Sequence, residues 1–217
     1  MNIEQARFNM IEQQIRPWDV LDLHVLDLLA RVRREDFVPP AYKALAFVDA
    51  EVPLGHGQVM LAPKVEARLL QDAQVQRHER VLEVGAGSGF MAALLAHRAQ
   101  SVIALERIGA LAAMATANLR RGGVLNASVR EMDGKAGLPG DGPFDVIMLS
   151  GSVAEVPQAL LDQLNVGGRL LAIVGQEPVM RAVRITRLSP TALQSQDLFD
   201  TVAPRLASFG ELTRFHF

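Results

Sequence analysis

Three glycines in one short turn are the residues whose spacing first indicates chemistry. Gly85, Gly87 and Gly89 follow an apolar run at 81–84 that is typical of a buried strand, and they precede an apolar run at 91–96 that is typical of a helix. Strand, glycine turn and helix form the nucleotide-binding corner of a doubly wound α/β sheet. Glycine permits positive φ and a close ligand, and the helix directs free N–H groups above the turn.

The spacing of these glycines separates two ligand classes. The pattern is G-x-G-x-G, and Phe90 stands where the dinucleotide fingerprint has its third glycine. S-adenosylmethionine has no pyrophosphate and needs no phosphate cradle. Glu83, inside the apolar strand, suits the cationic aminoacyl end of that molecule, directly or through water. The turn therefore favours S-adenosylmethionine over NAD, although a glycine motif alone is weak evidence.

Two further acidic residues support this prediction. Glu106 ends a second predicted strand at 101–105, about 20 residues past the first glycine, where a carboxylate accepts from both ribose hydroxyls. Asp133 follows a third predicted strand at 127–131, where it can accept from the adenine amino group. Alone, Glu106 is more often a solvated strand end and Asp133 a helix cap. In order at successive strand ends, the three features favour a cofactor site.

Composition narrows the class of protein. The chain has 217 residues, a formal charge of −2 and no cysteine. We expect no disulfide, no metal site, and no nucleic-acid or membrane partner. The N-terminus lacks a signal-peptide pattern, and no apolar run reaches the ~20 residues that span a bilayer. We therefore predict a cytoplasmic protein.

The remaining pattern predicts one α/β domain with an N-terminal helical extension. Residues 1–62 are predicted as two helices, at 3–15 and from an Asp19 N-cap through Val32, followed by an ordered loop over the site. Phe8 and Trp18 are predicted in the core of this extension, and Arg34 at a solvated helix end. Residues 63–217 are predicted as the cofactor-binding core, beginning with a helix at Pro63.

Alternation of strands and helices predicts a mostly parallel sheet with right-handed crossovers. Two further strands and three helices are expected in this core: strands 144–149 and 169–174, and helices 90–98, 109–120 and 157–164. Residues 179–188 alternate apolar with polar and indicate a half-exposed edge strand. Residues 212–217 are a candidate for the last strand.

With these motifs in place, the chain resembles the protein-L-isoaspartate O-methyltransferase family of class I S-adenosylmethionine-dependent methyltransferases. The resemblance covers most of the chain and rests on Phe37-Val38-Pro39, Gly55-His56-Gly57-Gln58, Ala62-Pro63, Val81 to Phe90, Met132-Asp133-Gly134, and Val156-Pro157 to Gly168-Arg169. It implies a Rossmann-like sheet with one reversed strand near its end. It also implies methyl transfer to the free carboxylate of isoaspartyl residues in damaged proteins, a protein repair activity.

The resemblance also assigns site residues. The cofactor-binding residues would be Glu83, Gly85, Gly87, Gly89, Glu106, Arg107, Asp133 and Gly134. The catalytic loop would contain His56, Gln58, Val59 and Leu61. Val59 and Leu61 stand where the family typically has threonine and serine, and Leu61 occupies the place of the serine assigned to catalysis and substrate contact.

This departure leaves the acceptor open. A carboxylate is ionised at neutral pH and needs no general base, but two lost hydroxyls weaken its binding by about one to two decades each. The leading hypothesis is isoaspartyl methylation. A more apolar acceptor, or a cofactor-binding relative without isoaspartyl activity, are the alternatives, with an NAD-dependent oxidoreductase well behind. His56 could orient an acceptor or act as a base, although a loop histidine bonded to backbone is the more common case.

Overall fold

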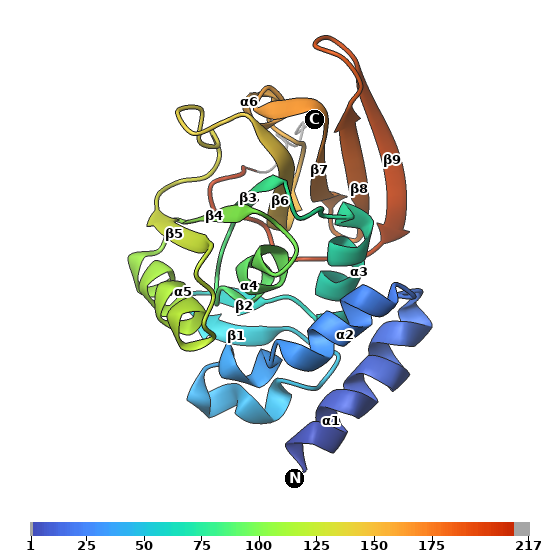
Figure 1. The fold of residues 1–217 in the computed structure, drawn as a ribbon, viewed down its shortest axis with the longest axis vertical. Helices are drawn as coiled ribbons and strands as arrows, with labels where there is room; N and C mark the ends of the chain where they lie inside the picture. The colour runs from blue at the N-terminus through green and yellow to red at the C-terminus, as the bar shows by residue number, and fades with distance from the viewer. Residues whose placement is uncertain (1, 211–217) are drawn as a thin grey trace, which may run out of the picture.

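A computed structural model describes residues 2–210 of the chain, and its centre is a seven-stranded mixed sheet (Figure 1). The strand order is β5-β4-β3-β6-β7-β8-β9. The bounds are Ala127–Glu131 for β5, Ser101–Glu106 for β4, Arg80–Val84 for β3, Phe144–Val153 for β6, Leu164–Gln176 for β7, Val179–Arg187 for β8 and Leu193–Asp200 for β9. β3 to β7 pair in parallel, and β8 is antiparallel to both of its neighbours. The predicted fold class, with one reversed strand, is confirmed.

Successive side chains of each central strand enter two different apolar layers. In β3, Val81 packs with helices α3 (Pro63–Ala73), α4 (Phe90–Ala96) and α5 (Gly109–Arg121), whereas Leu82 packs on the opposite face. That second face is covered by the short helix α6 (Gln158–Leu161) and by loops. This alternation follows from the two-residue period of a strand buried on both faces.

The predicted edge strand lies one place inside the sheet. β8 pairs with β7 on one side and with β9 on the other, so β9 forms the edge. β9 is largely exposed and polar, with the sequence LQSQDLFD, and polar edge strands carry no clear apolar period. The other candidate for a last strand, 212–217, lies outside the described residues.

Two other boundaries differ from the prediction. α6 has only four residues, and β7 begins at Leu164, so Gly168 lies within a strand and does not end a helix. A Cβ at Gly168 would stand 2.9 Å from the carbonyl oxygen of Asp145 on β6. Glycine is therefore required here because two backbones approach each other closely.

The N-terminal extension is helical as predicted, but its caps differ. α1 (Ile3–Met10) continues as a π-helical turn at Ile11–Ile15 and a 3-10 turn at Arg16–Trp18, which ends where Asp19 has φ 65°. The N-cap of α2 (Leu23–Arg31) is Asp22, whose carboxylate accepts from the amide of His24 at 2.8 Å. Short 3-10 turns at Arg34–Asp36 and Pro40–Leu45 follow.

Neither predicted aromatic lies in the core of the extension. Phe8 is 58% exposed. Trp18 is half-buried, with its ring edge-on to Phe199 of β9 at 5.6 Å between centroids. Trp18 therefore joins the extension to the edge of the sheet.

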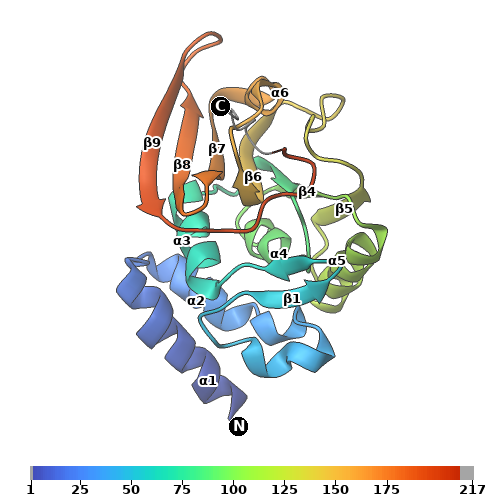
Figure 2. The same ribbon diagram turned by 180° about the vertical axis from the view of Figure 1, so that it is seen from behind.

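The segment predicted as a loop over the site is a β-hairpin. β1 (Val52–Gly55) and β2 (Gln58–Met60) pair across a turn in which His56 and Gly57 have φ of 55° and 70°. Figure 2 shows this hairpin beside α4, and the segment after β9 crosses the sheet at its strand ends. Among the described residues, no helix is long and apolar enough to cross a membrane.

Candidate active site

The glycine turn has the backbone that its sequence predicts. Gly85, Gly87 and Gly89 have φ of 90°, 52° and 82°, which side chains with a Cβ rarely adopt. A Cβ at Gly89 would lie 3.1 Å from the carbonyl oxygen of Ala115, so this glycine lets α4 pack against α5. Gly85 and Gly87 instead face the site, at the carboxyl end of β3.

Glu106 holds this turn in place. One carboxylate oxygen accepts from the amide of Gly87 at 2.9 Å, and the other accepts from the amide of Ile108 at 2.9 Å. The side chain is 7% exposed at the end of β4. Each carboxylate oxygen has a second lone pair, so Glu106 can still accept from a ligand hydroxyl.

Glu83 lies beneath the turn and is completely buried. Its Oε1 accepts from the Ser150 hydroxyl at 2.7 Å, and its Oε2 has no partner among the described residues. Burial raises the pKa of Glu83 to about 8, with smaller contributions from Glu66 and Glu106 and an opposing one from the Ser150 hydrogen bond. An unpartnered buried carboxylate oxygen is costly unless a ligand cation completes it.

The β-hairpin forms the other wall of the site. Val59 and Leu61 line a cavity of about 20 Å³ together with Glu83, Gly85 and Gly87. The side chain of Leu61 is directed inward and is 6% exposed.

The hairpin end is anchored by a buried ion pair. Arg34 is 1% exposed, so its prediction as a solvated helix end is wrong. Its guanidinium donates to the Leu61 carbonyl at 2.6 Å and pairs with Glu66 of α3. Burial raises the pKa of Glu66, and Arg34 opposes that rise. Sequence reasoning missed this pair, because both residues lie in segments whose polar side chains normally face water.

A C-terminal segment, residues 204–209, closes the site. Leu206 contacts Gly85 so closely that a Cβ there would lie 2.7 Å from Leu206 Cδ2. Two backbone hydrogen bonds with Ser152 fix the segment. The Ser152 amide donates to the Pro204 carbonyl at 2.8 Å, and the Leu206 amide donates to the Ser152 carbonyl at 2.9 Å. Beside it is a second cavity, of about 40 Å³, which Gln58, Gly85, Glu106, Arg107 and Gly134 line with this segment.

Asp133 is exposed and lies next in sequence to Gly134, which lines this second cavity. Hydrogen bonds from Ser208 and from the amide of Lys135, together with the charge of Arg107, lower its pKa against a smaller effect of burial. Its neighbour Gly134 is packed so tightly that a Cβ would lie 2.4 Å from Val84. Asp133 is thus bound to the closing segment in this structure.

The structure therefore gathers most of the predicted site residues around the glycine turn. Gln58, Val59, Leu61, Glu83, Gly85, Gly87, Glu106, Arg107 and Gly134 line one or other of the two small cavities. His56 is exposed at the hairpin tip and lines neither, and its side chain has no hydrogen bond within residues 2–210. In the same part of the chain, no group of three or more His, Asp or Glu side chains could hold a metal.

Comparison with known proteins agrees with this geometry. The family model for protein-L-isoaspartate(D-aspartate) O-methyltransferases matches residues 5–202. The chain belongs to this family. The protein-L-isoaspartate O-methyltransferase 1 of Rhodopseudomonas palustris is 42% identical over 195 residues, which are 89% of this chain and 80% of that relative.

A second relative and a solved structure are also similar to this chain. A protein-L-isoaspartate O-methyltransferase of Burkholderia ambifaria is 44% identical over 175 residues, which are 80% of this chain and only 56% of that longer relative. A Plasmodium falciparum structure described as a protein-L-isoaspartate O-methyltransferase with bound S-adenosyl-L-homocysteine has a TM-score of 0.74 and 21% identity, and the match covers 94% of this chain and 97% of that one. At this identity the structural match supports the fold alone.

Proposed function

We propose that this methyltransferase binds S-adenosylmethionine across the glycine turn and methylates the free carboxylate of isoaspartyl residues in proteins or peptides. The observation that carries the proposal is the buried pair Glu83 and Glu106 on either side of the turn, in a chain of the isoaspartyl methyltransferase family. We also propose that the protein is located in the cytoplasm.

The residues present fit this cofactor. Glu83 Oε2 is a buried acceptor without a partner, suited to an ammonium group. Gly85 and Gly87 have no Cβ that would hold a ligand away from the backbone, and Glu106 retains lone pairs for ribose hydroxyls. We propose that Asp133 accepts from the adenine amino group once Ser208 has moved away.

The present cavities are too small for the whole cofactor. They measure about 40 and 20 Å³, whereas ligand pockets typically measure roughly 300 Å³ or more. Leu206 fills the space against Gly85, which lines both cavities. Binding therefore requires residues 204–209 to shift, while the glycine turn and Glu106 already have the geometry of a binding site.

The reaction depends on positioning of the acceptor and the methyl group more than on acid–base catalysis. When bound, the sulfonium group supplies an activated methyl, whose carbon–sulfur bond breaks as the acceptor oxygen bonds to carbon and the electron pair remains on sulfur. An ionised carboxylate gives up no proton, so the chain needs no general base. The hairpin and the 204–209 segment exclude water and hold the acceptor in line.

A second candidate acceptor is an apolar molecule, and a specific observation favours it. Val59, Met60 and Leu61 place only apolar side chains on the hairpin wall of the site. None of the three can donate a side-chain hydrogen bond to a carboxylate. Ser150, which lines the same cavity, donates to Glu83.

The test is transfer of a labelled methyl group to an isoaspartyl peptide, with the matched aspartyl peptide as control. Label on the isoaspartyl peptide alone supports the proposal. If neither peptide is labelled while cofactor binding is measured in the same sample, isoaspartyl transfer is overturned and the apolar acceptor is favoured.

A further inference from the structure

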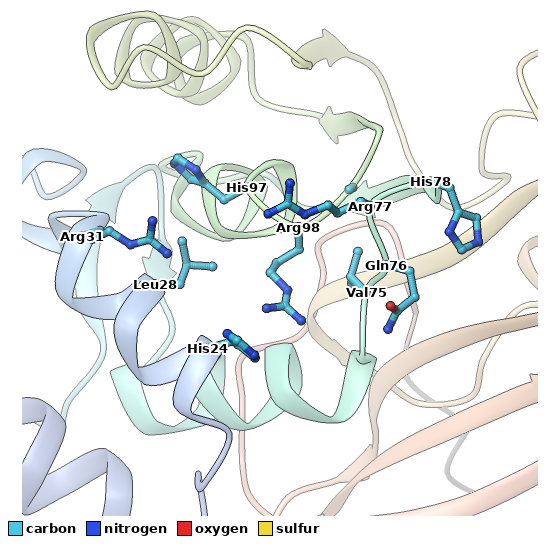
Figure 3. Close-up of a pocket in the computed structure, with 10 residues that line it drawn as sticks. His24, Leu28, Arg31, Val75, Gln76, Arg77, His78, His97 and Arg98 are labelled. Carbon is cyan, nitrogen blue, oxygen red and sulfur yellow. The ribbon is translucent and has the colours of Figure 1, made fainter.

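A cationic groove lies away from the cofactor site, where the chain enters β3 (Figure 3). It has a volume of about 860 Å³. Three segments that are distant in sequence form it: α2, the 75–78 turn and the end of α4. Its nitrogen-bearing side chains are His24, Arg31, Gln76, Arg77, His78, His97 and Arg98.

The charge of this groove is almost uncompensated. Its lining contains three arginines and three histidines and no carboxylate. Among the described residues, Arg31 is the one member of this lining with an acidic partner, Asp27, at 2.9 Å. Within residues 2–210, the guanidinium groups of Arg77 and Arg98 have neither an ion pair nor a hydrogen bond.

Arginines without an ion pair, such as Arg107 and Arg120, also occur elsewhere among the described residues, but this groove holds two of them together. The formal charge of the whole chain is −2, and arginines elsewhere are mostly paired with carboxylates. Pairs of this kind join Arg7 to Glu35, Arg16 to Glu12, Arg33 to Asp36, Arg34 to Glu66, Arg68 to Asp72, Arg130 to Asp141, Arg169 to Glu79, Arg181 to Asp197, and Arg187 to Asp162. Glu79, beside the groove in sequence, is one of the acids engaged elsewhere.

The positive groups are also close enough to affect one another. Burial and the charge of Arg31 lower the pKa of His97. Figure 3 shows Arg98 extending across the groove toward His24, with Arg31 and His97 on one side and Gln76 on the other. Arg98 is half-buried, so its charge is less screened than that of a free surface arginine.

The chemistry of the lining selects an anion. Guanidinium groups donate in a planar fork that matches phosphate oxygens, and three of them balance a di- or triphosphate. The volume admits a phosphate chain with an attached group of nucleoside size. Three histidines add donors around the rim.

We propose that the groove formed by α2, residues 75–78 and the end of α4 is a binding site for a linear phosphate chain, free or carried by a nucleotide. Arg77 and Arg98 contact the phosphates. Arg31 donates to the ligand as well, and its ion pair with Asp27 weakens when it does so. The site is separate from the glycine turn, so its occupation can be measured without methyl transfer.

Isothermal titration of the intact chain with tripolyphosphate at low ionic strength tests this site. We expect one molecule bound per chain. Arg98→Gln and Arg77→Gln each weaken binding by about tenfold or more, the loss expected for a charge-assisted bond. Arg120→Gln, which changes an exposed arginine at the end of α5, stays within about twofold. Thermal unfolding of each variant checks that it is folded.

Two results would overturn the site. One is no heat of binding up to about 1 mM tripolyphosphate, which would mean a Kd weaker than millimolar. The other is that Arg120→Gln weakens binding as much as Arg77→Gln and Arg98→Gln do. A glutamate hexapeptide that binds as well as tripolyphosphate would show a site for acidic peptides and contradict phosphate recognition. ATP distinguishes the two sources. An affinity equal to that of tripolyphosphate supports a free phosphate chain, and tighter binding of ATP supports a nucleotide.

Discussion

Glu83 is completely buried beneath the glycine turn, and burial raises its pKa to about 8. At pH 7 it is therefore mostly protonated in the free protein. A cofactor ammonium group beside Oε2 would favour the charged carboxylate and lower this pKa. Binding is then coupled to loss of a proton, because the bound state holds fewer protons than the free one.

We predict that cofactor binding at pH 7 releases nearly one proton, and that the affinity rises as the pH increases from 6 to 7.5. Calorimetric titration in two buffers of different ionisation enthalpy measures the release. Glu83→Gln has no proton to lose and should show neither effect. Equal proton release from wild type and Glu83→Gln would show that Glu83 does not meet the ammonium group.

The hairpin residues Val59 and Leu61 test the choice of acceptor. If the acceptor is a carboxylate, the double variant Val59→Thr/Leu61→Ser should raise kcat/KM on an isoaspartyl peptide by roughly one to two decades for each hydroxyl, because each adds a bond to a charged group. Val48→Thr, an exposed site before the hairpin, is the control and should change nothing. A double variant that stays folded and gains no activity would argue for an apolar acceptor.

Among single residues, the sequence indicated charged side chains in unusual positions and gave no indication of those in ordinary positions. Glu83 stands in an apolar strand and Glu106 at a strand end, so both were visible. Arg34 and Glu66 carry no such signal, because their burial depends on tertiary packing of α3 against the hairpin end.

Among the elements, the 204–209 segment governs access to the site. Leu206 occupies the space against Gly85 that the cofactor needs. Leu206→Ala should raise the association rate of S-adenosylhomocysteine by about fivefold, because displacing the segment then costs about 1 kcal/mol less. Stopped-flow measurement gives the rate, with Leu125→Ala, which is 95% exposed, as control. An unchanged rate for Leu206→Ala would mean that the cofactor reaches the turn by another path.

Element types were predictable wherever the apolar period was regular, as in β3, β4 and α5. The hairpin at 52–60 was not, because Pro53 and two glycines interrupt a strand pair of only four and three residues. β9 was not predictable either, because an exposed edge strand has no buried face and therefore no apolar alternation in its sequence. Asp19 and Asp22 are both plausible caps, and only the left-handed backbone at Asp19 decides between them.

For the whole molecule, the sheet and the helical extension share one apolar core, in which Ile15 and Val25 pack in the same cluster as Val81. We therefore propose a single domain over the whole chain. Thermal unfolding followed by far-UV circular dichroism, which reports the sheet and helices, and by fluorescence of Trp18 should give coincident transitions. A Trp18 transition several degrees below the other would show that the extension unfolds separately.

The parallel arrangement of the central strands was predictable because βα alternation joins successive strands by right-handed crossovers. The place of β8 inside the sheet was not predictable, because it depends on whether a later strand, here β9, pairs with the outer side of β8. The carboxyl ends of β3 and β4 nevertheless meet at the turn, as the motif spacing required.

The most direct test of the account is the affinity of this chain for S-adenosylmethionine with and without the Glu106 carboxylate. Glu106→Ala should weaken binding by about 10- to 100-fold, through lost ribose bonds and a loosened Gly87 amide. Glu131→Ala removes an exposed acid at the end of the neighbouring strand and should stay within about twofold. A Glu106→Ala protein that binds within twofold of wild type would contradict the placement of the cofactor at the glycine turn.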